Sequence, residues 1–204
     1  YFTAPGYRDE AERQFRKNIE AIYTSIEHTA EGVMTDKVSG FIHSGDPRFG
    51  FPDRNDLESI TTADLKQWLA SALKEDYLEI SLVADVDAEK ATAAGSSPFG
   101  AFPKRAEQKP AYTEARQVAF PAGKKKEFRF TTEIPKAVAT IYWPTEDMSD
   151  IKRTRRLTLL GSVLDDRLRI KVREELGETY SPACYHVAND TFKGYGYMTA
   201  MIEC

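Results

Sequence analysis

The sequence has few cysteines, few histidines, no long hydrophobic run and no excess of basic charge. Two cysteines among 204 residues are too few for a disulfide framework. No apolar run approaches the roughly 18 residues that a membrane-spanning helix needs, which argues against a membrane span. The chain has 28 basic and 32 acidic side chains and a net charge of −4. This balance argues against a nucleic-acid-binding protein, because such proteins normally present a basic face.

The sequence does contain enough apolar material for a folded core. Hydrophobic residues make up 41% of the chain and aromatic residues 11%, a composition that excludes a disordered tail. The length fits either one large domain or two partial ones. The chain begins at Tyr1 rather than at a methionine and stops at Cys204 within an apolar alternation. We therefore expect it to be part of a longer polypeptide, and it shows no targeting signal.

Three segments have the periodicity of amphipathic helices. Apolar residues recur at three- and four-residue steps over Asp9–Thr29. A second helix is predicted over Thr62–Leu73, because Thr61 and Asp64 form a capping-box pattern. The longest is predicted from Ser149 to about Leu176. The residues expected to face the core are Phe15, Ile19, Ile22, Tyr23 and Ile26 in the first helix, Leu65, Trp68, Leu69 and Ala72 in the second, and Leu157, Leu160, Val163, Leu164, Leu168 and Val172 in the third.

Alternating segments rich in β-branched and aromatic residues predict strands. They are Tyr77–Ala84, Ala115–Phe120, Glu127–Phe130, Ala137–Trp143, Tyr180–Ala188 and Phe192–Cys204. Helices and strands are segregated along the chain, which predicts an α+β fold with an antiparallel sheet. Asp87 is expected to cap a short helix, and Ala94–Pro110 is the predicted linker. If the last two strands turn near Asn189, Cys184 faces Tyr197, so we expect two free thiols.

The histidines do not predict a zinc site in this chain. His28, His43 and His186 are not spaced as a pair on one helix face. The segment from His28 begins like the inverted zinc motif His-x-x-Glu-His, but Gly32 stands where the second histidine is required. A helical zinc site needs both imidazoles. We therefore expect this chain by itself to bind no structural zinc and to hydrolyse no peptide.

Two charged clusters are predicted to be solvated. Adjacent carboxylates at Asp165 and Asp166 point about 100° apart on a helix, and Arg169 is in salt-bridge register with Asp165. The run Lys124-Lys125-Lys126 lies beside a predicted hairpin turn, where edge lysines commonly discourage aggregation. Neither cluster predicts a catalytic site.

A more informative segment begins in the last turn of the longest predicted helix. Arg173 lies in that turn, Gly177 is expected to end the helix, and Tyr180 begins the next strand. A sharp turn at Gly177 could bring the Tyr180 hydroxyl beside the Arg173 guanidinium. Such donors could bind a peptide carbonyl and stabilise the oxyanion formed when water attacks it. A structural arginine and an edge tyrosine remain the alternative.

This segment resembles the second-type domain of the insulinase/pitrilysin family of zinc metallopeptidases. The family pattern is a long helix, then Leu-Arg, Arg-Glu-x-Leu-Gly and Tyr-Ser, which here falls on Leu168–Ser181. Other segments agree in order, although Ala84 replaces a glycine of the family pattern. The resemblance covers most of Ile60–Ala200, and its further segments are Ser59–Leu69, Leu78–Asp87 and Phe99–Pro103.

The resemblance implies a sheet with helices packed on one face and a protease made of two halves, of which this chain belongs to the C-terminal, non-zinc half. It implies that residues 1–106 end a first-type domain and that 107–204 begin a second-type domain carrying the Arg/Tyr motif. Arg173 would bind a substrate carbonyl and Tyr180 would stabilise the tetrahedral intermediate of an extended peptide. Zinc, its ligands and the glutamate base would lie outside this chain, in an N-terminal half that is either the same polypeptide or a partner subunit.

Several expectations remain open at this point. The resemblance suggests a periplasmic or exported bacterial protein, and the alternative function is a non-catalytic core or scaffold subunit of the same fold. The outer edge of the strand Phe192–Cys204 is expected to lack a partner. We therefore expect this chain to self-associate by edge-to-edge pairing or segment exchange.

Overall fold

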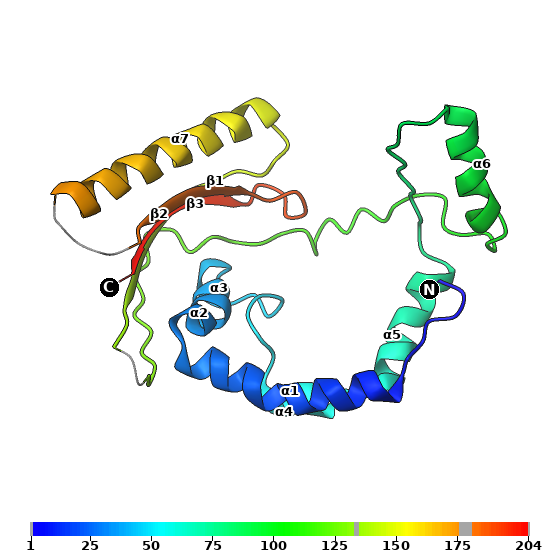
Figure 1. Ribbon diagram of the computed structural model, residues 1–204, viewed down its shortest axis with the longest axis horizontal. Coiled ribbons are helices and arrows are strands. Elements are labelled where there is room, and N and C mark those ends of the chain that lie inside the picture. The colour runs from blue at the N-terminus through cyan, green and yellow to red at the C-terminus, as the bar shows by residue number, and fades with distance from the viewer. Residues whose placement is uncertain (1, 133–134, 176–180, 204) are drawn as a thin grey trace. The chain divides into compact units, whose positions relative to one another are not determined.

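A computed structural model describes residues 2–132, 135–175 and 181–203 of the chain, without the side chains of residues 173–175 (Figure 1). The chain forms two compact units. One consists of Tyr1–Asn18 and Asn55–Ala111, and the other of Ile19–Arg54 and Tyr112–Cys204. The helix α1 (Asp9–His28) contributes residues to both.

The first unit contains α5 (Thr62–Lys74), and its predicted capping box is confirmed. The Thr61 hydroxyl accepts from the Asp64 amide at 3.2 Å, and the Asp64 carboxylate accepts from the Thr61 amide at 2.9 Å. The other end of α5 is closed by Arg105, whose guanidinium donates to carbonyl oxygens of the last helical turn and of the residues after it. These contacts satisfy backbone groups that the helix itself leaves unpaired.

Two further helices begin in or near this unit. Short α4 (Arg54–Ser59) precedes α5, and α6 (Ala88–Phe99) follows Asp87, at the place predicted for a helix. The predicted linker Ala94–Pro110 is only partly correct, because α6 continues to Phe99.

Two expectations for the first unit are wrong. The segment Tyr77–Ala84 is not a strand, and no described strand lies beside it to complete a ladder. None of the residues predicted to be buried in α5 is buried: Trp68 has 77% of its surface accessible and Leu65 has 42%, whereas Leu69 and Ala72 are half-buried. Both errors have one cause. A periodic pattern of apolar residues predicts which face of a helix or strand should be buried, but the residues needed to bury that face lie elsewhere in the chain.

The second unit contains a three-stranded antiparallel sheet (Figure 1). Its strands are β1 (Val138–Thr145), β2 (Ala183–Ala188) and β3 (Gly196–Glu203), in the order β1-β3-β2. Tyr142 lies opposite Thr199. The predicted α+β class with an antiparallel sheet is confirmed.

Helix α7 (Ile151–Arg169) packs against β2 and continues as a π-helix, η2 (Ile170–Glu175). The Asp150 carboxylate caps its first turn by accepting from two backbone amides. A side chain at Gly161 would come within 3.3 Å of the β2 backbone, so the glycine allows a close approach. Leu160 and Val163, expected to face the core, are each 45% exposed, because α7 covers the β2 side of the sheet and leaves these positions uncovered.

The other face of the sheet looks toward three short helical segments that follow α1. These are α2 (Ala30–Val33), the π-helix η1 (Met34–Val38) and α3 (Ser39–Ile42). Three of the predicted core residues of α1, Ile19, Tyr23 and Ile26, are buried. Phe15, also expected in the core, is 40% exposed.

Three strand predictions in the second unit are wrong. Ala115–Phe120, which begins in a turn, and Glu127–Phe130 do not form strands. The last strand, β3, is not at an edge, because β1 and β2 pair with its two sides. The last strand therefore has no unpaired edge, and the expected self-association through that edge loses its basis.

The register of the last hairpin also differs from the prediction. Cys184 lies opposite Ala200 rather than Tyr197, since the strands are joined by a loop over residues 189–195 and not by a tight turn at Asn189. Cys184 is buried and is a free thiol. Cys204 lies outside the described residues.

Candidate functional site

The two residues nominated from the sequence are only partly described. The backbone of Arg173 lies in η2, directly after α7, but its side chain is outside the described groups. Tyr180 also lies outside the described residues, as does Gly177. The pairing of the Arg173 guanidinium with the Tyr180 hydroxyl therefore stays a prediction.

A hydrogen bond joins α7 and β2, the elements that come before and after the segment containing Arg173 and Tyr180. The Asp165 carboxylate of α7 accepts a hydrogen bond from the Cys184 amide of β2 at 2.7 Å. Asp166 instead forms an ion pair with Arg169 at 2.7 Å. Asp165 thus joins helix to strand, whereas the sequence predicted that both carboxylates were solvated. This contact holds α7 against the start of β2.

Each histidine has a structural partner within the protein. The Nδ1 atom of His28 lies 3.0 Å from the Thr131 carbonyl oxygen, and Nε2 of His186 lies 3.0 Å from the Thr145 hydroxyl. Among the described side chains, which leave out those of residues 173–180, no three histidine, cysteine, aspartate or glutamate groups lie together so that they could hold a metal ion. These side chains therefore do not fit a zinc ion.

His43 occupies a site that the sequence did not predict. Its ring stacks on Phe49 with centroids 3.5 Å apart and on Tyr195 with centroids 4.9 Å apart. Its Nδ1 atom lies 2.6 Å from the Ser39 carbonyl oxygen. Burial lowers the pKa of His43, and the Ser39 carbonyl and the Asp46 carboxylate partly oppose that effect. Burial therefore favours the neutral imidazole, and the stack packs the residues after α3 against the residue that precedes β3.

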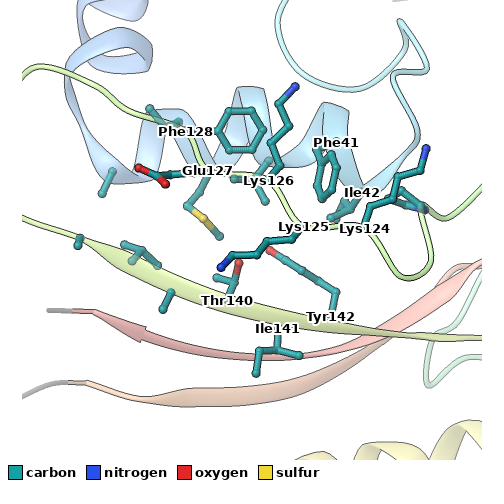
Figure 2. A pocket seen from close by; sticks show the side chains of 18 of the residues that line it. Phe41, Ile42, Lys124, Lys125, Lys126, Glu127, Phe128, Thr140, Ile141 and Tyr142 are labelled. Carbon is teal, nitrogen blue, oxygen red and sulfur yellow. The ribbon is translucent and has the colours of Figure 1, made fainter.

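The second unit also contains a cleft of about 920 Å³. Its walls come from residues 30–42, the extended chain 120–130 and the first part of β1. Figure 2 shows Lys124, Lys125 and Lys126 around this cleft, above Thr140 and Tyr142 of β1. Sequence reasoning missed the cleft because one wall, residues 30–42, is far along the chain from the other two.

Comparison with known proteins places the chain in a family. The family model described as the peptidase M16 inactive domain matches residues 59–204, which is well over half of the chain. Searches of curated proteins and of solved structures found no match. None of the described helices has both the length and the apolar character needed to cross a membrane. The match confirms the insulinase/pitrilysin resemblance, and the chain belongs to the M16 peptidase family.

Proposed function

We propose that this chain supplies substrate-binding and transition-state-stabilising groups to a zinc-dependent M16 endopeptidase whose zinc site lies outside it. The observation that carries the proposal is the family match, which includes the whole segment from Arg173 to Ser181. We infer that residues 1–106 end a first-type domain and that 107–204 begin a second-type domain.

The chemistry assigned to the pair follows from its functional groups. A guanidinium offers several donors in a fixed plane, and Arg173 would bind a carbonyl oxygen of an extended peptide in the ground state. A phenol offers one donor, and Tyr180 would donate to the oxyanion that forms when water attacks the scissile carbonyl. Zinc, held in the zinc-bearing N-terminal half, would supply the activated water. The peptide substrate and that half are thus the proposed partners.

The experiment is kinetic and uses the peptidase that combines this chain with its zinc-bearing half. Tyr180→Phe should lower kcat by ~10²–10³ with little change in KM, because the hydroxyl acts mainly on the developing charge. Arg173→Ala should impair both parameters. Tyr185→Phe is a matched control, because Tyr185 is an exposed tyrosine of β2. Unchanged kinetics in Tyr180→Phe and in Arg173→Ala, with zinc content retained, would contradict the proposal.

A second candidate is a non-catalytic core or scaffold subunit with the same fold. The description of the matched family model as an inactive domain favours it. The two functions differ in what accompanies this chain: a peptidase requires a half that encodes His-x-x-Glu-His, and a scaffold does not. Sequencing the gene on both sides of this segment, followed by a zinc determination on the assembled protein, separates them.

A further inference from the structure

The cleft in the second unit combines a basic rim with an apolar interior. Lys124, Lys125 and Lys126 line it from the extended chain, and each is exposed. Figure 2 shows the Lys125 side chain extending toward Thr140 on the opposite wall. A volume of about 920 Å³ is at the upper end of the range usual for sites that enclose a ligand.

The other charges of the cleft are already neutralised. Lys136 forms ion pairs with Glu31 and with Glu203. Glu127 pairs with Arg129 at 2.7 Å. Among the described residues, by contrast, no carboxylate forms an ion pair with any of the three rim lysines. The rim therefore keeps an excess of positive charge, and a cleft with low-dielectric walls focuses such a field.

The interior is suited to aromatic or aliphatic groups. The ring of Phe41 meets the ring of Phe128 edge-on with centroids 6.2 Å apart, and the Lys126 ammonium lies 5.6 Å from the Phe128 centroid. Ile42 and Tyr142 add further apolar surface. A ligand that carried only negative charge would leave this surface wet, whereas apolar groups would displace the water from it.

One wall of the cleft follows the start of β1. Seven consecutive residues of the chain, Lys136–Tyr142, line it, and seven residues of extended chain span roughly 20 Å. An extended peptide therefore matches the length of this wall.

We propose that this cleft binds an extended acidic peptide segment in which carboxylates alternate with apolar side chains. The carboxylates meet the rim lysines, and the apolar side chains lie against Phe41, Phe128 and Tyr142. This inference does not rest on the proposed function, because binding needs only the residues described here and no zinc.

The test is calorimetric titration of the protein with a capped seven-residue peptide of alternating glutamate and phenylalanine. We expect saturable binding of this peptide and none of the lysine–phenylalanine analogue. In the variant Lys124→Gln/Lys125→Gln/Lys126→Gln, affinity should fall about tenfold, because three exposed charge contacts are lost together. Circular dichroism checks that this variant is folded, which is expected because the three side chains are exposed.

The matched control removes the same charge elsewhere. Lys17, Lys109 and Lys152 are exposed and do not line the cleft. Their joint replacement by glutamine should leave the affinity within about twofold, since distant surface charges are screened. Equal weakening in the two triple variants would overturn the proposal, as would failure of the glutamate–phenylalanine peptide to bind. Equally tight binding of a glutamate–serine peptide would also overturn it, because the apolar interior would then have no role.

Carbodiimide cross-linking locates the bound peptide. Zero-length cross-links between the glutamates of the peptide and Lys124, Lys125 or Lys126 are expected. Cross-links confined to lysines outside the cleft would overturn the proposed location.

Discussion

The Tyr195 hydroxyl donates a 2.8 Å hydrogen bond to the carbonyl oxygen of Ile42. The two residues are 153 positions apart in the chain, and both are buried. The contact joins the end of α3 to the residue that precedes β3, beside the stacked ring of His43. It therefore fixes the end of α3 against the residue that precedes β3, and Ile42 also lines the cleft described above.

The first prediction concerns this bond. Tyr195→Phe should lower the free energy of unfolding by about 1–2 kcal/mol, because a buried carbonyl loses its partner while ring packing is kept. Urea unfolding followed by circular dichroism measures the change. Tyr185→Phe, at a position that is 48% exposed, should change stability by less than about 0.5 kcal/mol. Equal effects in the two variants would show that the Tyr195 hydroxyl is not a significant contact.

The second prediction concerns pH. Burial lowers the pKa of His43, so the folded chain prefers the neutral ring more strongly than the unfolded chain does. The stabilisation is complete above the ordinary histidine pKa of about 6.5 and is lost as the pH falls below it, because the unfolded chain then binds the proton more readily. The free energy of unfolding should therefore decrease between about pH 7.5 and pH 5.5.

Variants separate this effect from that of the other histidines. Burial also lowers the pKa of His186, so part of the pH dependence should remain when His43 is replaced. His43→Phe keeps an aromatic ring in the stack and should reduce the slope of stability against pH. Identical slopes in His43→Phe and in the parent would contradict the assignment to His43.

The helices were largely predictable because their signals are local. Thr61 and Asp64 cap α5 through groups three residues apart, and the recurrence of apolar residues in α1 places its core contacts at Ile19 and Tyr23. Each signal depends only on neighbouring positions of one helix. The side of a helix that is finally covered is not local, which explains why Trp68 is exposed.

Strands were predicted less well because each needs a partner. Tyr77–Ala84 and Ala137–Trp143 have similar alternation, but only the second pairs with another strand, as β1. The register of Cys184 depended on the length of the loop after β2. The Asn189 side chain accepts from two backbone amides in that loop and stabilises a longer connection than a two-residue turn. Periodicity carries no information about such a loop.

The two candidate sites differ in the same respect, because only one of them has a local signal in the sequence. Arg173 and Tyr180 could be nominated because they lie close together in a recognisable pattern, and their family is confirmed by the match to residues 59–204. The lysine run could be seen in the sequence but was interpreted as a solvated loop. Its relation to Phe41 appears only when residues 30–42, which are distant in the chain, pack beside it. Tertiary contacts of that kind are not encoded by any single window of sequence.

The third prediction concerns Asp147, which links the start of α7 to the loop before β3. Its carboxylate accepts from the Gly194 amide at 2.6 Å and from the Ser149 amide at 2.9 Å. Gly194 has φ +70°, a conformation that glycine adopts without strain and that points its amide at the carboxylate. These donors, with the Gly194 amide contributing most, lower the pKa of Asp147 to about 2.

Because the pKa is lower in the folded chain than the ordinary value of 3.8, the contribution to stability is complete above about pH 4 and is lost as the pH falls toward about 2. Asp147→Asn should therefore destabilise the protein by roughly 1 kcal/mol at pH 7, since an amide oxygen is a weaker acceptor than a carboxylate in this half-exposed position. The difference between variant and parent should shrink when unfolding is measured at pH 3. Asp85→Asn, at an exposed position, should change the stability at pH 7 by less than about 0.5 kcal/mol. A difference at Asp147 that is as large at pH 3 as at pH 7 would show that the carboxylate charge is not its cause.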